Sequence, residues 1–297
     1  MQRSTGKRKW QILIPKSALF QKGATMILVV ASNEDVASTN IAEKIIGLYG
    51  FAEKEETFQE NSVYQKTICN SDIKLITIKS ESINAQFITE VFVPRLLIFI
   101  SRHSSQSGIP TLSVHTPGNL TDEAEKGGVS KHVSISPASA MKEAIREMVR
   151  QVEKKKLAYE VSYECTHHGP SLNIPTMFVE LGSSPKQWLD ADAAEAVAHA
   201  AIAAATNQTE YPTVIGIGGP HYNEKFTKIA LTTSTAFGHM IPKYSIAKID
   251  SDMLLQCVRK TVEKVESVLL DWKGVKGEDK EELIKTINAA NLKAEKV

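Results

Sequence analysis

The histidines are the residues of this sequence best suited to chemistry. Six of the eight follow a strand-like apolar run or lie in a loop rich in Gly and Pro. They are His103, His115, His167, His168, His221 and His239. Histidine titrates near neutral pH, and its neutral imidazole is the commonest metal ligand. The shared placement predicts one site for metal binding or acid–base catalysis, although a single loop histidine is more often structural. We expect His132 and His199 to be structural.

The adjacent pair His167-His168 sets a condition on the backbone. Neighbouring side chains on an extended strand point to opposite faces, so both imidazoles reach one site only if the chain bends. Gly169-Pro170 follows directly, and this pair is typical of a bend.

Two other side chains near the histidines have alternative roles. Glu180 ends the apolar run 177–179, where a carboxylate can be a metal ligand, a general base or a salt-bridge partner. Cys165 lies two residues before His167 and is a candidate nucleophile. No neighbouring feature marks a lowered thiol pKa, so a buried, inert cysteine is the favoured interpretation.

The segment Gly216–Gly219 is rich in glycine but lacks the spacing of a dinucleotide-binding loop, and Pro220 obstructs a following helix. The backbone N–H groups of Gly218 and Gly219 could instead hold an anion or a developing oxyanion. The sequence contains no Walker A, Cys-x-x-Cys, His-Glu-x-x-His or Gly-x-Ser-x-Gly motif.

Short apolar runs alternate with helical patterns from Met26 onward. The predicted strands are 26–31, 73–78, 96–100, 111–114, 159–165, 176–180, 213–217 and 228–232. The predicted helices are 34–49 with Gly50 as C-cap, 136–156 and 184–205 opening at Ser-Pro pairs, 252–271 and 280–292. This alternation predicts a three-layer α/β/α domain with a mixed, mostly parallel sheet. Ligands bind beyond the carboxyl ends of such strands, so the histidine loops should converge there.

The amino-acid composition argues against a disordered, a membrane-spanning or a disulfide-rich protein. A chain of 32.7 kDa with 42% hydrophobic residues can bury a large core and is too apolar for disorder. The richest apolar run, Leu96–Ile100, is far shorter than the roughly 20 residues of a membrane helix. Three widely spaced cysteines form no disulfide framework, which favours a reducing cytoplasm. We expect a monomer with one catalytic domain over 26–297, carrying insertions, and no membrane contact.

The formal net charge of +1 hides an asymmetry. Residues 1–25 contain six basic residues and no acidic one, which leaves 29 basic and 34 acidic residues, a net −5, in 26–297. We expect the basic extension 1–25 to be disordered or a translation start assigned too early. A nucleic-acid-binding tail or a targeting peptide are the alternatives.

Because residues 26–297 carry a net charge of −5, bulk positive charge cannot attract a nucleic acid to them. Nucleic-acid binding would require a local basic patch. Candidate phosphate-binding side chains lie on the predicted helix 136–156 and near the glycine-rich loops. They are Arg146, Arg150, Lys154, Lys225 and Lys243. A solvated helical face is the alternative for the first three.

Taken in order, these motifs resemble the archaeal and plant type of D-aminoacyl-tRNA deacylase. The matching segments are Met26–Asn33, Ser101–His103, His115–Asn119, Thr166–Pro170, Phe178–Ser183, Gly216–Tyr222, Phe226-Thr227 and Phe237–Tyr244. The resemblance covers roughly 26–276. It implies a cytosolic hydrolase that removes D-amino acids from mischarged tRNA, a zinc requirement of one or two ions, and a phosphorylase/hydrolase-like fold.

Under this resemblance, zinc would polarise the ester carbonyl and lower the pKa of water to about 7. We expect His103, His167, His168, Glu180 and His221 to be the metal ligands. His115 or His239 would move protons to the ribose oxygen, and Gly218 and Gly219 would hold the oxyanion.

Two other functions fit the same residues. A zinc amidohydrolase or carboxypeptidase-like enzyme acting on a small molecule would share the histidine site without an RNA surface. A non-catalytic protein would bind metal or RNA without turnover.

Overall fold

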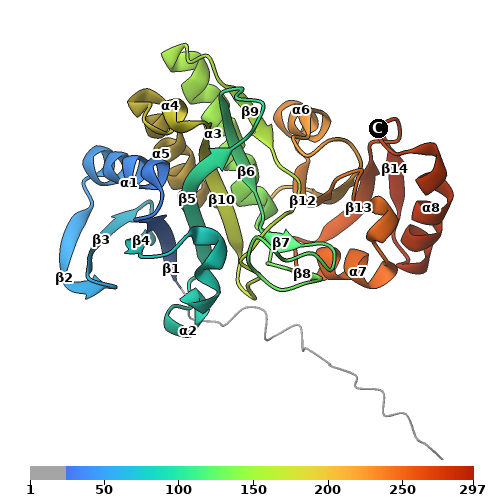
Figure 1. The fold of residues 1–297 in the computed structure, drawn as a ribbon, viewed down its shortest axis with the longest axis horizontal. Coiled ribbons are helices and arrows are strands. Elements are labelled where there is room, and N and C mark those ends of the chain that lie inside the picture. The colour runs from blue at the N-terminus through green and yellow to red at the C-terminus, as the bar shows by residue number, and fades with distance from the viewer. Residues whose placement is uncertain (1–24) are drawn as a thin grey trace, which may run out of the picture.

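The computed structural model describes residues 25–297, so the basic extension 1–25 lies, except for Thr25, outside the described residues. The described strands form a large sheet, a smaller sheet and a short two-stranded ribbon (Figure 1).

The large sheet has eight strands in the order β2-β3-β4-β1-β5-β10-β6-β9. They are β1 Met26–Ser32, β2 Ala52–Phe58, β3 Asn61–Ile68, β4 Ser71–Ile78, β5 Leu96–Ser104, β6 Thr111–His115, β9 Glu160–Tyr163 and β10 Thr176–Ser183. Pairs β1–β4, β1–β5, β5–β10 and β6–β9 are parallel, and β2–β3, β3–β4 and β6–β10 are antiparallel. Residues 26–31 of β1 and 96–100 of β5 are uninterrupted apolar runs because both faces of the sheet are covered there. The predicted α/β class with a mixed, mostly parallel sheet is confirmed.

Three helices pack against one face of this sheet: α1 (Val36–Tyr49), α3 (Ala138–Lys155) and α5 (Ala191–Thr206) (Figure 1). Helix α1 begins after Asp35, whose side chain accepts a hydrogen bond from the Ser38 amide. It ends at Gly50, which has a φ of 63° as a left-handed C-cap and confirms that prediction. The alanines of α5 are small enough to let this helix lie close to both α3 and the sheet.

The opposite face of the sheet packs against η2 (Ser82–Phe87), α2 (Ile88–Val91) and the segment around Leu172. Phe99 and Phe178 stack there with ring centroids 4.8 Å apart. Residues two apart on a strand share a face, so Glu180 points to the same side as Phe178.

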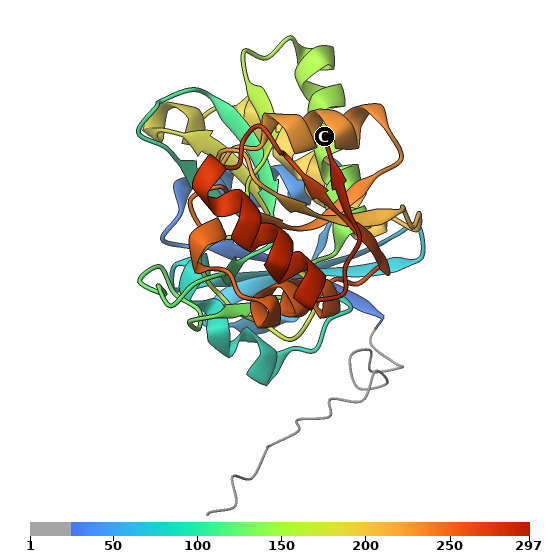
Figure 2. The same cartoon turned by 90° about the vertical axis from the view of Figure 1, so that its right-hand side faces the viewer.

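The smaller sheet contains β12 (Ala236–Ile241), β11 (Thr213–Ile217), β13 (Val265–Leu270) and β14 (Ala294–Lys296), all parallel. Helices α7 (Ser251–Arg259) and α8 (Lys280–Ala289) pack into its hydrophobic core, and Figure 2 shows α8 crossing the front of this sheet. The other elements are α4 Pro185–Trp188, α6 Glu224–Thr232, β7 Gly118–Asn119, β8 His132–Val133, η3 Ile246–Lys248 and η4 Gly277–Asp279.

One segment joins the two sheets directly. Glu164 pairs with Tyr222, the Cys165 amide donates to the His221 carbonyl, and the Thr166 amide donates to the Met240 carbonyl. A single catalytic domain over 26–297 stays a prediction, and this segment supports it because it holds both sheets together.

Several predicted elements differ from the structure. The run 228–232 is the end of helix α6, not a strand, because the Asn223 side chain accepts from the Phe226 amide and starts a helix there. The predicted helix 252–271 is helix α7 followed by strand β13. Val265 and Leu269, which extended the helical stripe, lie in this strand. The predicted helix 184–205 is two helices, since the Asp190 side chain caps a new start. Strand β12 was not predicted.

Helix α3 also begins differently from the prediction. The Ser136 side chain does not cap it; the Glu263 carboxylate accepts from the amides of Ala138 and Ser139 instead. Within 25–297, the structure contains no helix that combines the length and apolar character needed to cross a bilayer.

Candidate active site

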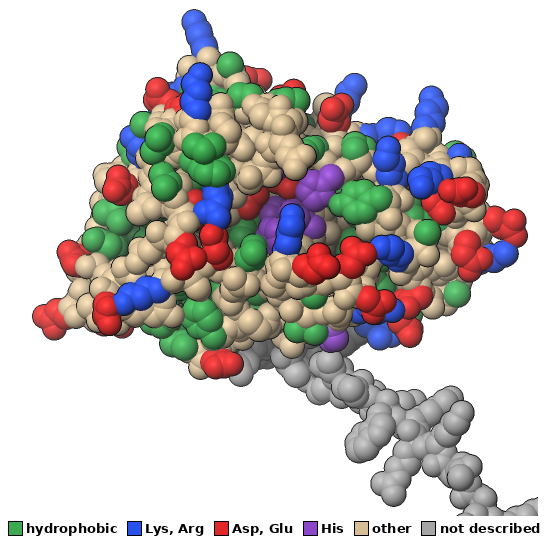
Figure 3. Space-filling view, viewed as in Figure 1, with side chains coloured by type: hydrophobic (Ala, Val, Ile, Leu, Met, Phe, Trp, Pro, Cys, Tyr) green, Lys and Arg blue, Asp and Glu red, His purple; other side chains and the backbone are tan. Residues whose placement is uncertain are grey.

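A cavity of about 690 Å³ opens at the carboxyl ends of β1, β4 and β5, on the face of the large sheet opposite α1, α3 and α5. Histidine side chains are visible at the bottom of this hollow near the middle of the molecule (Figure 3). The lining includes all five predicted metal ligands, which are His103, His167, His168, Glu180 and His221. It also includes Asp35, Arg102, Lys126, Glu164, Tyr222 and Tyr244.

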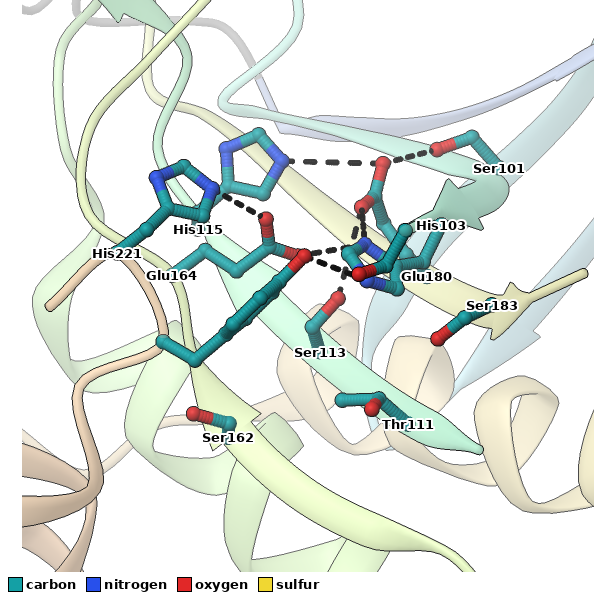
Figure 4. A network of polar contacts seen from close by, with 12 residues as sticks. Ser101, His103, Thr111, Ser113, His115, Ser162, Glu164, Glu180, Ser183 and His221 are labelled. Atoms are coloured by element: carbon teal, nitrogen blue, oxygen red, sulfur yellow. Dashed lines mark hydrogen bonds and ion pairs between the residues drawn. The ribbon is translucent and has the colours of Figure 1, made fainter. Parts of the chain in front are cut away.

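Two buried carboxylates form the centre of the cluster (Figure 4). Glu180 Oε1 accepts from Ser101 Oγ at 2.7 Å, and its Oε2 lies 3.6 Å from His103 Nδ1. Glu164 Oε1 lies 3.1 Å from the same His103 nitrogen. One ligand atom from each of these three residues falls within 4.8 Å of the other two. Carboxylates buried this close together require a compensating positive charge.

The second oxygen of Glu164 faces different imidazoles. Its Oε2 lies 2.9 Å from His221 Nε2 and 3.6 Å from His167 Nε2. Burial opposes ionisation, but His103, His221 and His167 hold the pKa of Glu164 well below its ordinary value. The same balance lowers the pKa of Glu180 to about 2, since the nearby imidazoles of His103 and His115 favour the carboxylate more than burial opposes it. Both groups are therefore carboxylates at neutral pH and offer anionic oxygens to a cation.

Among the protein groups alone, His103 carries the compensating positive charge, so a metal ion that binds to this imidazole must displace its proton. Burial lowers its pKa, but Glu164 and Glu180 more than offset this and raise the pKa of His103 to about 11. Its other nitrogen, Nε2, lies 3.1 Å from the Tyr222 hydroxyl. The imidazole is thus fixed with Nδ1 between the two carboxylates.

The chain bends at His168, which has a φ of 42°, and the rings of His167 and His168 lie 4.2 Å apart. The Nδ1–H of His167 donates to the Cys165 carbonyl and that of His168 to the Gly169 carbonyl. A carbonyl only accepts, so these bonds leave both Nε2 atoms with a free lone pair. Burial and the neighbouring imidazoles lower the pKa of His167 well below its ordinary value and the pKa of His168 to about 4. Both rings are neutral, as metal ligands must be.

His115 is a further imidazole of this cluster and lies beneath the residues that line the cavity. It is fully buried against Phe178, with its ring 4.3 Å from that of His167 and 4.9 Å from that of His168. Its Nε2 lies 3.7 Å from Glu180 Oε1. Neither ring nitrogen has a hydrogen-bond partner among residues 25–297. Buried imidazole nitrogens left unsatisfied in this way fit a site whose remaining contacts come from a bound ion.

The other predicted catalytic residues lie away from this cluster. His239 is fully buried in β12, where Nδ1 contacts Thr166 Oγ1 at 3.1 Å and Nε2 donates to the Lys260 carbonyl at 3.0 Å. The Gly218 amide already donates to the Ile241 carbonyl, and Gly219 packs against Asn223 and Asp271. The structure therefore does not bring His239, Gly218 or Gly219 to the cavity within its described part.

The predicted phosphate-binding residues divide into two groups. Arg146 and Arg150 pair with Glu143 and Glu147 on helix α3, and Lys154 is exposed near the end of this helix, on the other side of the sheet from the cavity. Lys225 pairs with Asp271 at 2.5 Å, whereas Lys243 is exposed directly before the cavity residue Tyr244.

Three residues that the sequence analysis kept apart from the site, Cys165, His199 and His132, do not line the cavity. Burial raises the pKa of the Cys165 thiol, which favours the inert interpretation. His199 contacts the Tyr49 hydroxyl at 2.6 Å, and His132 is exposed on β8.

Sequence reasoning missed Glu164, which is the second-to-last residue of the predicted strand 159–165 and lies three residues before His167. An acidic residue near the end of a predicted strand and close to a histidine is the signal that could have identified it.

Comparison with known proteins identifies the family of this chain. Residues 91–295 match the family model described as D-aminoacyl-tRNA deacylase. The chain belongs to the D-aminoacyl-tRNA deacylase family. A family protein of this name from Thermococcus kodakarensis is 38% identical over 265 residues, 86% of this chain and 94% of that protein. Another from Methanosarcina barkeri is 32% identical over 274 residues, 90% of this chain and 88% of that protein.

A solved structure of a conserved protein of unknown function shares the fold, with a TM-score of 0.81 and 31% identity over 93% of this chain and 96% of that chain. The family assignment made from the sequence is confirmed. The enzyme class that it carries, a hydrolase acting on ester bonds, is confirmed with it.

Proposed function

We propose that this member of the D-aminoacyl-tRNA deacylase family hydrolyses the ester bond between a D-amino acid and tRNA, as the names of its relatives state for them. The observation that carries the proposal is the cluster of two buried carboxylates and four imidazoles that line the cavity beyond β1, β4 and β5, with a fifth imidazole, His115, buried directly behind them. In this proposal the protein acts as a monomer in the cytoplasm and recycles mischarged tRNA.

The donor set supports zinc as the metal. Imidazole nitrogen and carboxylate oxygen are both zinc ligands, and three groups of donors each have their ligand atoms within 4.8 Å of one another. We assign the ligand role to the five predicted residues His103, His167, His168, Glu180 and His221, and add Glu164, which two of the groups share. Zinc bound there would polarise the ester carbonyl and lower the pKa of water to about 7.

The chain's own residues supply orientation and proton transfer. The backbone carbonyls at Cys165 and Gly169 fix the tautomers of the two adjacent histidines. Of the two residues predicted to move protons, His115 lies against Glu180, which lines the cavity. We propose that this pair exchanges protons with the attacking water and the leaving ribose oxygen. Proton transfer by His239 and an oxyanion site at Gly218 and Gly219 stay predictions. The contacts that these residues make with their own surroundings do not support either role.

One comparison of substrates separates this function from its closest rival. The deacylase should cleave D-tyrosyl-tRNA far faster than the methyl ester of D-tyrosine at equal concentration, since the tRNA contributes binding energy. Equal rates on both would favour a small-molecule hydrolase. Binding of zinc and tRNA without turnover of either ester would favour the non-catalytic alternative.

A further inference from the structure

Tyr244 is an exposed aromatic side chain at the mouth of the cavity. It lines the cavity, yet its side chain is 57% exposed. Large apolar rings exposed beside a functional cavity are typical of binding surfaces. The Tyr244 ring is therefore not explained by packing in the hydrophobic core.

Its hydroxyl group is already engaged with the metal-binding cluster. Tyr244 Oη lies 3.0 Å from His221 Nδ1, and His221 Nε2 lies 2.9 Å from Glu164 Oε2. The ring of Tyr244 runs at 24° to that of His221, with centroids 6.5 Å apart. This contact orients His221 and at the same time ties the outer end of the tyrosine in place.

The backbone around Tyr244 is also fixed. The Lys243 amide donates to the Gly219 carbonyl, and the Ser245 amide donates to the Pro242 carbonyl. A tyrosine held at both its backbone and its hydroxyl loses little conformational entropy when a second ring stacks on it. Lys243, exposed beside it, adds a positive charge on this rim.

We infer that Tyr244 is the stacking platform for the terminal nucleobase of the tRNA, with Lys243 beside the adjoining phosphate. The inference rests on the proposed function, because the scissile ester joins the amino acid to the terminal ribose. With the ester carbonyl at the metal held by this cluster, the ribose would lie between the metal and the cavity mouth, where its base would meet the exposed ring. Proteins bind single-stranded RNA ends in this way, by aromatic stacking combined with nearby positive charge.

The other ring that could stack on Tyr244 is the side chain of an aromatic amino acid substrate. The two occupants differ in one measurable respect. A base platform serves every aminoacyl-tRNA alike, whereas a side-chain platform serves D-tyrosyl-tRNA and leaves D-alanyl-tRNA unaffected.

The test compares Tyr244→Leu, which removes the ring, with Tyr244→Phe, which removes only the hydroxyl. Leu48→Ala, at another exposed apolar side chain on helix α1, is the control. At saturating zinc, Tyr244→Leu should raise KM for D-tyrosyl-tRNA and D-alanyl-tRNA, and Kd for the trinucleotide CCA, by about 5- to 150-fold. Tyr244→Phe should keep KM and Kd close to wild type but bind zinc about 10- to 100-fold more weakly, because His221 loses its partner.

Two results would overturn the inference. One is unchanged CCA binding by Tyr244→Leu, and the other is a KM effect confined to D-tyrosyl-tRNA. If the wild-type protein left both aminoacyl-tRNAs intact, the proposed function would fail instead. The CCA measurement would still decide whether Tyr244 binds a nucleotide, so the two failures are distinguishable.

Discussion

At the scale of single residues, two carboxylates that each face several imidazoles organise the site. Glu164 is the less obvious of the two, because its oxygens point to different histidines, His103 on one side and His221 with His167 on the other. Removing its charge should therefore disturb the whole donor set rather than a single contact.

The variant Glu164→Gln keeps the shape of the side chain and removes the anionic oxygen. We expect it to lower deacylation at least about 100-fold and to bind less zinc, since an amide is a much poorer zinc ligand than a carboxylate. Zinc content by elemental analysis and single-turnover deacylation measure the two effects. Glu153→Gln, on the exposed part of helix α3, is the matched control. Wild-type zinc content in Glu164→Gln would remove this residue from the ligand set.

The adjacent histidines allow a second test. His167→Ala and His168→Ala, made one at a time, should each cut deacylation by orders of magnitude and leave the melting temperature nearly unchanged, because each ring contributes an Nε2 lone pair rather than core packing. Activity close to wild type in both variants would refute the site assignment. A parallel loss of activity and folding would point to a structural role.

The sequence was informative about these residues because an ionisable side chain beside a buried apolar strand is uncommon unless it is paired. It could not distinguish His239 from the others. His239 looks the same in the sequence but lies inside β12, where Thr166 and the Lys260 carbonyl take both nitrogens. Strand boundaries, and hence the direction of each imidazole, came only from the fold.

His239 predicts a pH dependence of stability. Burial lowers its pKa to about 4, below the value of about 6.5 expected in the unfolded chain. Between these values the unfolded state binds a proton that the folded state does not, so stability from this residue is lost as the pH falls from 6.5 to 4. The difference in unfolding free energy between wild type and His239→Gln should therefore shrink by about 3 kcal/mol over that range. A difference independent of pH, measured by urea unfolding, would contradict this.

At the scale of elements, helix α3 is held to the smaller sheet by a buried lysine that the sequence did not single out. The Lys142 ammonium donates to the carbonyls of Ala230, Thr233 and Thr235, where α6 ends and β12 begins. A run of helical residues gives no sign of such a contact, since the acceptors are backbone groups about 90 residues away.

Replacing this lysine tests the contact. Lys142→Met leaves three carbonyls without their shared donor and should lower the free energy of unfolding by about 3 kcal/mol. Lys154→Met, an exposed lysine of the same helix, should change it by less than about 0.5 kcal/mol. Equal effects of the two substitutions in denaturant unfolding would show that the contact contributes nothing.

The elements themselves were predictable where the apolar pattern was unambiguous. The central strands β1, β5 and β10 and helix α1 were predicted because long buried runs and a Gly C-cap are strong signals. The prediction of one helix over 252–271 was wrong because apolar residues spaced for a helix also suit a buried strand. Only the pairing of β13 with β11 decides between helix and strand.

At the scale of the whole molecule, an acidic body must bind an acidic substrate. Residues 26–297 carry a net −5, so tRNA contacts have to be local. The fold places Lys243 next to the cavity residue Tyr244 and Lys154 on the opposite side of the large sheet.

Binding of tRNA should therefore weaken as the salt concentration rises, and the two lysines should differ. Lys243→Gln should reduce the slope of log affinity against log salt by about one, and Lys154→Gln should leave it unchanged. The reverse pattern, measured by filter binding over a salt series, would place the phosphate surface on helix α3 instead.

The central claim is that the histidine–carboxylate cluster binds zinc and deacylates D-aminoacyl-tRNA. The most direct measurement is the hydrolysis rate of D-tyrosyl-tRNA against L-tyrosyl-tRNA, before chelation, after it, and after zinc is restored. We predict fast cleavage of the D-ester alone, loss of that activity on chelation, and its return with zinc. Equal cleavage of both esters, or full activity in the chelated protein, would contradict the account.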